Sequence, residues 1–280
     1  MTREDLYRQI TLKKSMLCVG LDVDYAKMPE HIKSLSTSEI AVKGKLYGGK
    51  TRSVIEFNKA IIDATAQYCV AYKPNLAFYE SYGTDGLRAL EVTVDYIRTT
   101  YPDMFLIADA KRGDIGNTAR MYAKAFFESM DFDAVTLSPY MGQDSIQPFL
   151  DYKGKWAIVP ALTSNQSAVQ FQLAEKDGKP LYRAVMEEMM SVSTPDNMMF
   201  VVGATKAEKL KEIRTFCPDN FLLVPGVGAQ GGSAEEVIKY GANDKGGLLI
   251  NSSRGILYAD STPDFAKAAA RVAASTARIQ

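Results

Sequence analysis

The sequence predicts an α/β fold, a single (β/α)8 TIM barrel domain spanning residues 1–280. Eight short apolar runs recur along the chain, and most are followed by a segment with helical spacing of its apolar residues. Near-continuous apolar strands that alternate with helices indicate a parallel sheet covered on both faces. The chain of 280 residues also has the length of one such barrel. A doubly wound open sheet is the alternative, but eight repeated units favour the closed barrel.

The expected strands coincide with the apolar runs, at residues 15–23, 70–78, 104–111, 134–140, 156–164, 198–205, 221–228 and 247–254. Apolar residues at helical spacing predict helices over residues 54–68, 85–100, 117–130, 182–192, 206–216, 234–240 and 263–276. The segment 144–152 is the weakest helix, because Pro148 interrupts it. Polar stretches at 34–52 and 165–180 are expected to form long loops after the first and fifth strands. That end of a barrel is where active sites are assembled.

The composition limits what the protein can bind and in which cellular compartment it is expected. The formal net charge is +0, so no long-range field attracts nucleic acid or an anionic membrane. The sequence has one histidine and no C-x-x-C motif, and we therefore expect no metal site. Cys18, Cys69 and Cys217 are widely spaced and predict buried thiols in a reducing compartment. No apolar run approaches about 20 residues, the length of a membrane span. These features predict a cytoplasmic protein.

A dense cluster of charge follows the third apolar run, in FLIADAKRGDIGNT (105–118). Asp109 and Lys111 are two residues apart on a strand, so we expect both side chains on the same side. Asp114 follows in the loop. Lys73 lies in the apolar context AYKPN, where a lone buried lysine would be costly without an acidic neighbour. Because the second and third strands of a barrel are adjacent, we expect Lys73 beside Asp109.

The resulting array of Lys73, Asp109, Lys111 and Asp114 has a chemical consequence. Nearby carboxylates favour the protonated form of Lys111, and a protonated lysine fixed in a pocket is a general acid. Carboxylates beside a substrate anion repel it until the substrate loses its charged group as CO2. The alternative is a solvated strand end with ordinary ion pairs. A further charged strand end, Asp22 in LDVD, favours the functional interpretation.

The last two strands predict a phosphate site. The seventh strand runs into PGVGAQGGSAEE (225–236), where glycines allow close backbone approach and the helix from Ser233 offers free N–H groups. Arg254 ends the eighth strand, and the loops after these two strands commonly hold phosphate in barrels. A tight turn plus a surface arginine is the alternative. After the fifth strand, Ser164 could hydrogen-bond an amide-like ring edge, as could Gln166 or Gln170, but each is equally well explained as a turn residue.

Six motifs resemble the orotidine 5′-phosphate decarboxylase family over nearly the whole chain: LDVD (21–24), YKPN (72–75), DAKRGDIGNT (109–118), TSN (163–165), PGVGAQGG (225–232) and SSRG (252–255). The long DAKRGDIGNT block is the most specific, and AYKPN and PGVGAQGG resemble the longer bacterial branch. The resemblance implies a (β/α)8 barrel, a homodimer with sites at its interface, and conversion of orotidine 5′-phosphate to UMP and CO2. That reaction is the last step of de novo UMP synthesis, and the family carries it out without metal or organic cofactor.

The resemblance also implies roles for individual residues. Lys111 would protonate C6 of the pyrimidine as CO2 leaves, and Asp109 would lie beside the departing carboxylate, in a network with Lys73 and Asp114. Asp114 and Thr118 would come from the partner subunit and contact the ribose. The remaining substrate contacts would be Asp22 at a ribose hydroxyl, Ser164 at the pyrimidine edge, and Gly228, Gln230 and Arg254 at the phosphate.

Two rival functions remain open from the sequence. A 3-keto-gulonate 6-phosphate decarboxylase or a hexulose-phosphate synthase shares the D-x-K-x-x-D pattern but uses Mg2+ and an enediolate. Lys73 fits the charged network better than a metal site. The second rival is a catalytically silent barrel that binds a phosphate compound, which the full set of charged strand ends disfavours.

Overall fold

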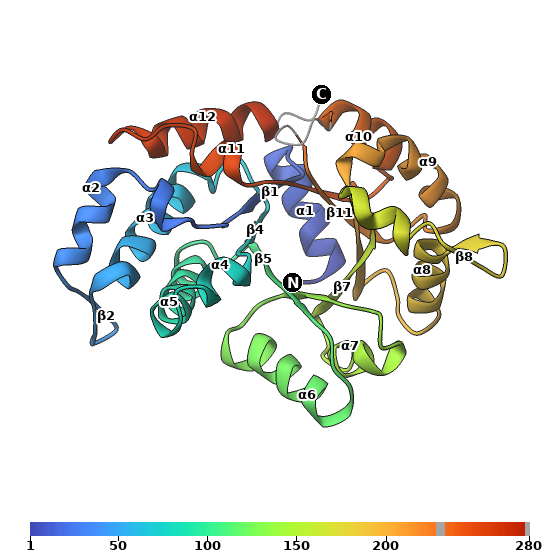
Figure 1. The fold of residues 1–280 in the computed structure, drawn as a ribbon. Coiled ribbons are helices and arrows are strands. Elements are labelled where there is room, and N and C mark those ends of the chain that lie inside the picture. The colour runs from blue at the N-terminus through green and yellow to red at the C-terminus, as the bar shows by residue number, and fades with distance from the viewer. Residues whose placement is uncertain (228–232, 278–280) are drawn as a thin grey trace. The chain divides into compact units, whose positions relative to one another are not determined.

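The computed structural model describes residues 1–227 and 233–277. Its main strands form a closed barrel in the order β1-β12-β11-β10-β7-β6-β5-β4. The pairs β1–β4, β4–β5, β6–β7, β7–β10, β10–β11 and β11–β12 are parallel. Helices separate successive strands along the chain (Figure 1). The predicted (β/α)8 barrel is therefore confirmed.

The chain divides into two compact units. The first unit comprises Met1–Leu12 and Ala110–Ser252, and the second comprises Lys13–Asp109 and Ser253–Gln280. Strand β5 (Phe105–Arg112) crosses from the second unit into the first. The expectation of one domain over residues 1–280 stays a prediction.

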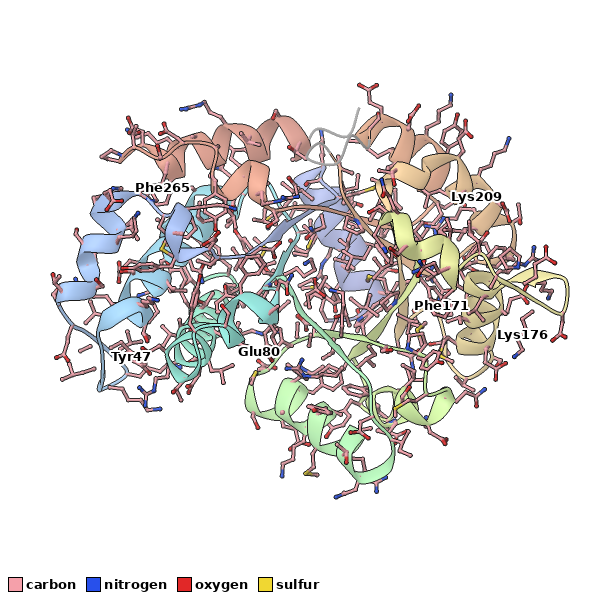
Figure 2. The ribbon with its side chains drawn as sticks, viewed as in Figure 1. Tyr47, Glu80, Phe171, Lys176, Lys209 and Phe265 are labelled. Atoms are coloured by element: carbon pink, nitrogen blue, oxygen red, sulfur yellow. The ribbon has the colours of Figure 1, made fainter. Side chains whose placement is uncertain are left out.

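The second unit holds two complete barrel strands, β1 (Leu17–Gly20) and β4 (Ala71–Lys73). Its helices and short 3-10 turns are η1 (Tyr25–Lys27), α2 (Glu30–Lys33), η2 (Ser34–Thr37), α3 (Gly49–Thr65), α4 (Leu76–Glu80), α5 (Thr84–Thr100), α11 (Arg254–Leu257) and α12 (Phe265–Ala277). Helix α3 packs against both α5 and α12. Phe57 of α3 stacks on Phe265 of α12 with the ring centroids 5.3 Å apart, and Figure 2 labels Phe265 at that helix.

The first unit holds the other five strands, β6 (Ala134–Leu137), β7 (Trp156–Leu162), β10 (Met198–Val202), β11 (Phe221–Pro225) and β12 (Leu248–Ser252). Its helices and turns are α6 (Gly116–Lys124), the π-helical η3 (Ala125–Ser129), η4 (Gln143–Ser145), α7 (Gln147–Leu150), η5 (Gln166–Gln170), α8 (Leu181–Ser191), η6 (Ala204–Lys206), α9 (Ala207–Phe216) and α10 (Ala234–Gly241). Helix α1 (Arg3–Lys13) begins in this unit.

The two stretches expected to be long loops are more structured than predicted. Each contains a β-hairpin, β2 (Ile40–Val42) with β3 (Lys45–Tyr47), and β8 (Glu175–Lys176) with β9 (Lys179–Pro180). The two-residue turns are Lys43-Gly44 and Asp177-Gly178, and all four residues have positive φ. Such turns match the twist of paired strands. Figure 1 shows the second hairpin beside α8. Glycine at the second position of each turn, Gly44 and Gly178, is a hairpin signal that the prediction of two loops did not use.

Most of the expected strands extend beyond the observed ones, and the second and the eighth show the physical reason. The second ends at Lys73, because Pro74 supplies no N–H and Asn75 caps α4 by accepting a hydrogen bond from the Ala77 N–H. The eighth ends at Ser252, and Arg254 opens the short helix α11 instead of continuing the strand.

The three cysteines are unbridged and buried, as predicted. Within the described ranges, none of the helices combines the length and the apolar character that crossing a membrane requires.

Candidate active site

The predicted pairing of Lys73 with Asp109 is present in the second unit. Lys73 ends β4, and its Nζ donates to Asp109 Oδ2 at 2.7 Å, with the two side chains only 5% and 10% exposed. The backbone fixes the register, because the Asp109 N–H donates to the Pro74 carbonyl at 3.0 Å. Removing either member of this buried ion pair would leave the other charge uncompensated, at a large cost in folding free energy.

The charge of Lys73 is held by its neighbours. Burial by itself lowers the pKa of Lys73, but the negative charges of Asp109 and Asp22 and the hydrogen bond to Asp109 outweigh it. The pKa of Lys73 therefore lies above its usual range. Lys73 is a fixed cation at neutral pH, and it has no tendency to act as a base there.

Asp22 lies just after β1 and is half-buried. Among the described residues, its Oδ1 is one of six buried side-chain nitrogen or oxygen atoms that have no hydrogen-bond partner. A buried acceptor without a partner is costly. It is an oxygen available to a ligand hydroxyl.

Two tyrosines hold the backbone that carries Asp22. The Tyr258 hydroxyl accepts from the Asp24 N–H at 2.6 Å and donates to the Asp22 carbonyl at 3.1 Å. The Tyr82 hydroxyl accepts from the Tyr25 N–H at 2.8 Å and donates to the Val23 carbonyl at 3.0 Å. This turn is therefore fixed by side chains from distant parts of the sequence, which no local pattern indicated.

Lys111 has an unusual backbone. Its φ of 46° lies in the left-handed region, which lysine rarely adopts. The amides of Ala110 and Lys111 both donate to Thr136 Oγ1, each at 2.9 Å. The regular alternation expected along this strand therefore does not continue through Lys111. Lys111 is exposed, whereas Asp109 is buried.

Asp114 and Thr118 lie beyond the strand, in the loop and in the first turns of α6. Asp114 is half-buried, and its Oδ1 accepts from the Ile115 N–H at 2.8 Å; Thr118 is exposed.

Ser164 is half-buried just after β7, where Gly203 allows a close approach. A Cβ at position 203 would lie 2.8 Å from both the backbone nitrogen and the Cβ of Ser164, so position 203 requires glycine. Gln166 and Gln170 are exposed in η5. Gln172 instead reaches this strand end, where it accepts from the Thr163 N–H at 2.7 Å and donates to the Thr163 hydroxyl at 2.8 Å.

The predicted phosphate contacts are described only in part. Gly228 and Gln230 lie outside the described residues. Arg254 is exposed at the start of α11, in the second unit. Ser233 caps α10 as expected, since its hydroxyl accepts from the Glu236 N–H at 3.3 Å. Gly226 has a φ of 94°, as a tight turn after β11 requires.

The structure thus brings Lys73 and Asp109 together, with Asp22 close enough to favour the lysine's charge. It places Lys111, Asp114, Thr118 and Ser164 in the first unit. Sequence reasoning missed Thr136, Tyr82, Tyr258 and Gln172. Only Thr136 carried a signal, as a polar residue inside the apolar run AVTL. Over the described part of the chain, no group of three or more His, Cys, Asp or Glu side chains is arranged to hold a metal ion.

A (β/α)8 barrel whose strands end in buried and strained charged residues has the architecture of a barrel enzyme. A sequence model of the Orotidine 5'-phosphate decarboxylase / HUMPS family matches residues 15–270. The chain is 53% identical to orotidine 5'-phosphate decarboxylase of Bacteroides fragilis, over 100% of this chain and 97% of that protein. The chain belongs to this family.

Solved structures of proteins with related names are also similar to this chain. The structure of Leishmania donovani OMP decarboxylase has 34% identity and a TM-score of 0.77, with 99% of each chain covered. Leishmania donovani UMP synthase has 34% identity and a TM-score of 0.79, over 98% of this chain and 55% of that one. The present chain therefore spans about half the length of the latter protein.

Proposed function

We propose that the protein decarboxylates orotidine 5′-phosphate to UMP and CO2, the last step of de novo UMP synthesis. One observation carries the proposal: Asp109, buried and paired with Lys73, lies two residues before Lys111, whose backbone is strained. Full-length similarity to proteins that carry the decarboxylase name supports the same reaction.

In the proposed reaction the bond between C6 and the carboxylate breaks, and its electron pair stays on C6. CO2 leaves, and Lys111 Nζ donates a proton to C6. The carbanion has no π-delocalisation, so the positive charge of Lys111 is the main means of stabilising it. Asp109, held by Lys73, lies beside the substrate carboxylate and repels it until CO2 departs. The Lys73–Asp109–Lys111–Asp114 network completes the site without a metal or organic cofactor.

The other residues bind the substrate. Asp22 takes a ribose hydroxyl, supported by its buried, unpartnered Oδ1. Thr118 contacts the ribose, and Ser164 contacts the pyrimidine edge. Gly228, Gln230 and Arg254 hold the phosphate. Because the phosphate is remote from C6, its binding energy can offset the repulsion at the carboxylate.

We also propose a homodimer in which Asp114 and Thr118 act in the partner's site. Large apolar side chains close to both residues in the sequence are exposed on the first unit. Ile115 is 48% exposed and Met121 53%, and Tyr140 and Met141 after β6 are 90% and 56% exposed. Several large exposed apolar side chains on one unit are typical of a protein that binds a partner. Mixing Lys111→Ala with Asp114→Ala subunits tests this, because hybrid dimers regain one intact site; no recovery of activity in the mixture contradicts the shared site.

A cytoplasmic location belongs to the same proposal. It is supported by three unbridged, buried cysteines, which suit a reducing compartment.

The proposed reaction is tested by an ultraviolet assay of purified protein with orotidine 5′-phosphate in excess EDTA, beside a Lys111→Ala variant. We expect the wild type alone to form UMP. The family description also covers the HUMPS branch, so activity on a sugar phosphate that requires Mg2+ would assign the enediolate chemistry instead. Arg254→Ala should mainly raise KM for the nucleotide, and an unchanged kcat/KM would remove Arg254 from the phosphate site.

A further inference from the structure

Thr136 is a buried hydroxyl that the reaction itself does not use. It lies in β6, is 1% exposed, and its Oγ1 accepts the amide protons of both Ala110 and Lys111. In a regular strand successive N–H groups point to opposite edges. Two neighbouring amides can share one acceptor only where the strand is locally irregular, as in a β-bulge. The left-handed φ of Lys111 is that irregularity.

The residues after Lys111 are held by the same strand end. The Arg112 carbonyl accepts from the Ser138 N–H at 2.7 Å, and a Cβ at Gly113 would come within 3.0 Å of the Ser138 side chain. The Arg112 guanidinium donates back to the Ala110 carbonyl at 2.9 Å and lies over the Tyr122 ring. The strained residue is therefore fixed on both sides, as a persistent left-handed conformation requires.

We propose that Thr136 is a positioning residue for Lys111, whose hydroxyl selects the backbone conformation that aims the lysine side chain at its substrate. The catalytic part of this inference rests on the proposed function. Thr136 suits the task because a β-branched side chain has few χ1 rotamers and a hydroxyl oxygen has two lone pairs. Valine has the same shape but no acceptor, so both amides would lose their partner.

The test compares Thr136→Val with Thr136→Ser, which keeps the hydroxyl. We expect Thr136→Val to lower kcat by about 100-fold, the cost of a displacement near 1 Å, while KM and UMP binding change little. Thr136→Ser should retain most of the wild-type kcat. Amide hydrogen exchange of Ala110 and Lys111 should accelerate in Thr136→Val and stay protected in Thr136→Ser.

A matched control is Thr93→Val in α5. Thr93 is also 1% exposed, and its hydroxyl donates to the Ala89 carbonyl. We expect lower stability but unchanged kcat in this variant. An equal kcat loss in Thr93→Val and Thr136→Val would mean a general effect of a lost buried hydroxyl and would overturn the inference. A wild-type kcat in Thr136→Val would also overturn it.

If Thr136→Val does not fold, Thr136→Ala and Thr136→Ser form the deciding pair, since they differ by one hydroxyl. Equal kcat in these two would again reject the role. Failure of the proposed function has a separate signature, because wild-type protein would then not convert orotidine 5′-phosphate. The amide-exchange comparison would still report whether Thr136 holds the Lys111 backbone.

Discussion

Asp109 and Lys111 lie two residues apart on β5, yet different interactions hold them in place. Asp109 is held through its side chain, which is 10% exposed and 2.7 Å from Lys73 Nζ. Lys111 is held through its backbone, in a left-handed conformation fixed by Thr136, with an exposed side chain. Asp109 is thus a charge fixed in place, whereas Lys111, whose side chain is exposed, is the proton donor of the reaction proposed above.

The largest expected effect comes from removing the proposed proton donor. Lys111→Ala should lower kcat by about 10⁴-fold, because in the proposed reaction Lys111 both donates the proton and stabilises the carbanion. The free energy of unfolding should change by less than about 0.5 kcal/mol, since the side chain is exposed. Steady-state kinetics and urea denaturation of one preparation check both expectations. A large loss of stability would mean that Lys111 is also a structural residue.

Removing Lys73, the cation that pairs with Asp109, should instead produce a large loss of stability. Lys73→Met leaves Asp109 buried without its cation and should cost about 3–5 kcal/mol of unfolding free energy. The double variant Lys73→Met/Asp109→Leu should cost less, because neither charge remains. Urea denaturation at pH 7 measures both. If the double variant is as unstable as the single one, packing and not charge explains the loss.

The stability that the Lys73–Asp109 pair contributes should also depend on pH. The folded pKa of Lys73 is raised above its unfolded value of about 10.4, so its contribution is complete below that pH. The contribution is lost as pH rises toward the folded pKa. The difference in unfolding free energy between wild type and Lys73→Met should therefore be constant from about pH 7 to 9 and shrink above about 10.5. A decline between pH 7 and 9 would indicate a lowered pKa instead.

The turn that carries Asp22 should respond more moderately. Tyr258→Phe removes the hydroxyl between the Asp24 N–H and the Asp22 carbonyl and should cost about 1–3 kcal/mol of stability. KM for the nucleotide should rise, because Asp22 is no longer held in place. Tyr96→Phe is the control, since the Tyr96 hydroxyl donates an exposed hydrogen bond to Asp63 in the same unit. Equal effects on KM in the two variants would contradict a positioning role for Tyr258.

The smallest effect isolates the strain at Lys111. Glycine adopts positive φ without steric cost, so Lys111→Gly should be about 1 kcal/mol more stable than Lys111→Ala. At Lys124, whose φ is −58° in a helix, the order should reverse, with alanine more stable by about 1 kcal/mol. Thermal or urea unfolding of the four variants gives both differences. The same order at both positions would argue against strain at Lys111.

Much of this protein follows from local sequence. The apolar runs determined the barrel, because strands covered on both faces must be nearly continuous in apolar residues. The isolated Lys73 in AYKPN implied an acidic partner, and Asp109 provides it, because a buried lysine needs a counter-charge. Asp22 and Lys111 were also predicted as charges at strand ends, and they lie just after β1 and near the end of β5.

Only the tertiary structure decided how those charges are held. The sequence predicted regular alternation from Asp109 to Lys111, but the Thr136 hydroxyl, 25 residues further along the chain from Lys111, fixes a left-handed residue there. Tyr258 lies 236 residues from Asp22, whose carbonyl it binds. Hydrogen bonds between residues so far apart depend on how the strands and helices pack. Local propensity and spacing contain no information about them.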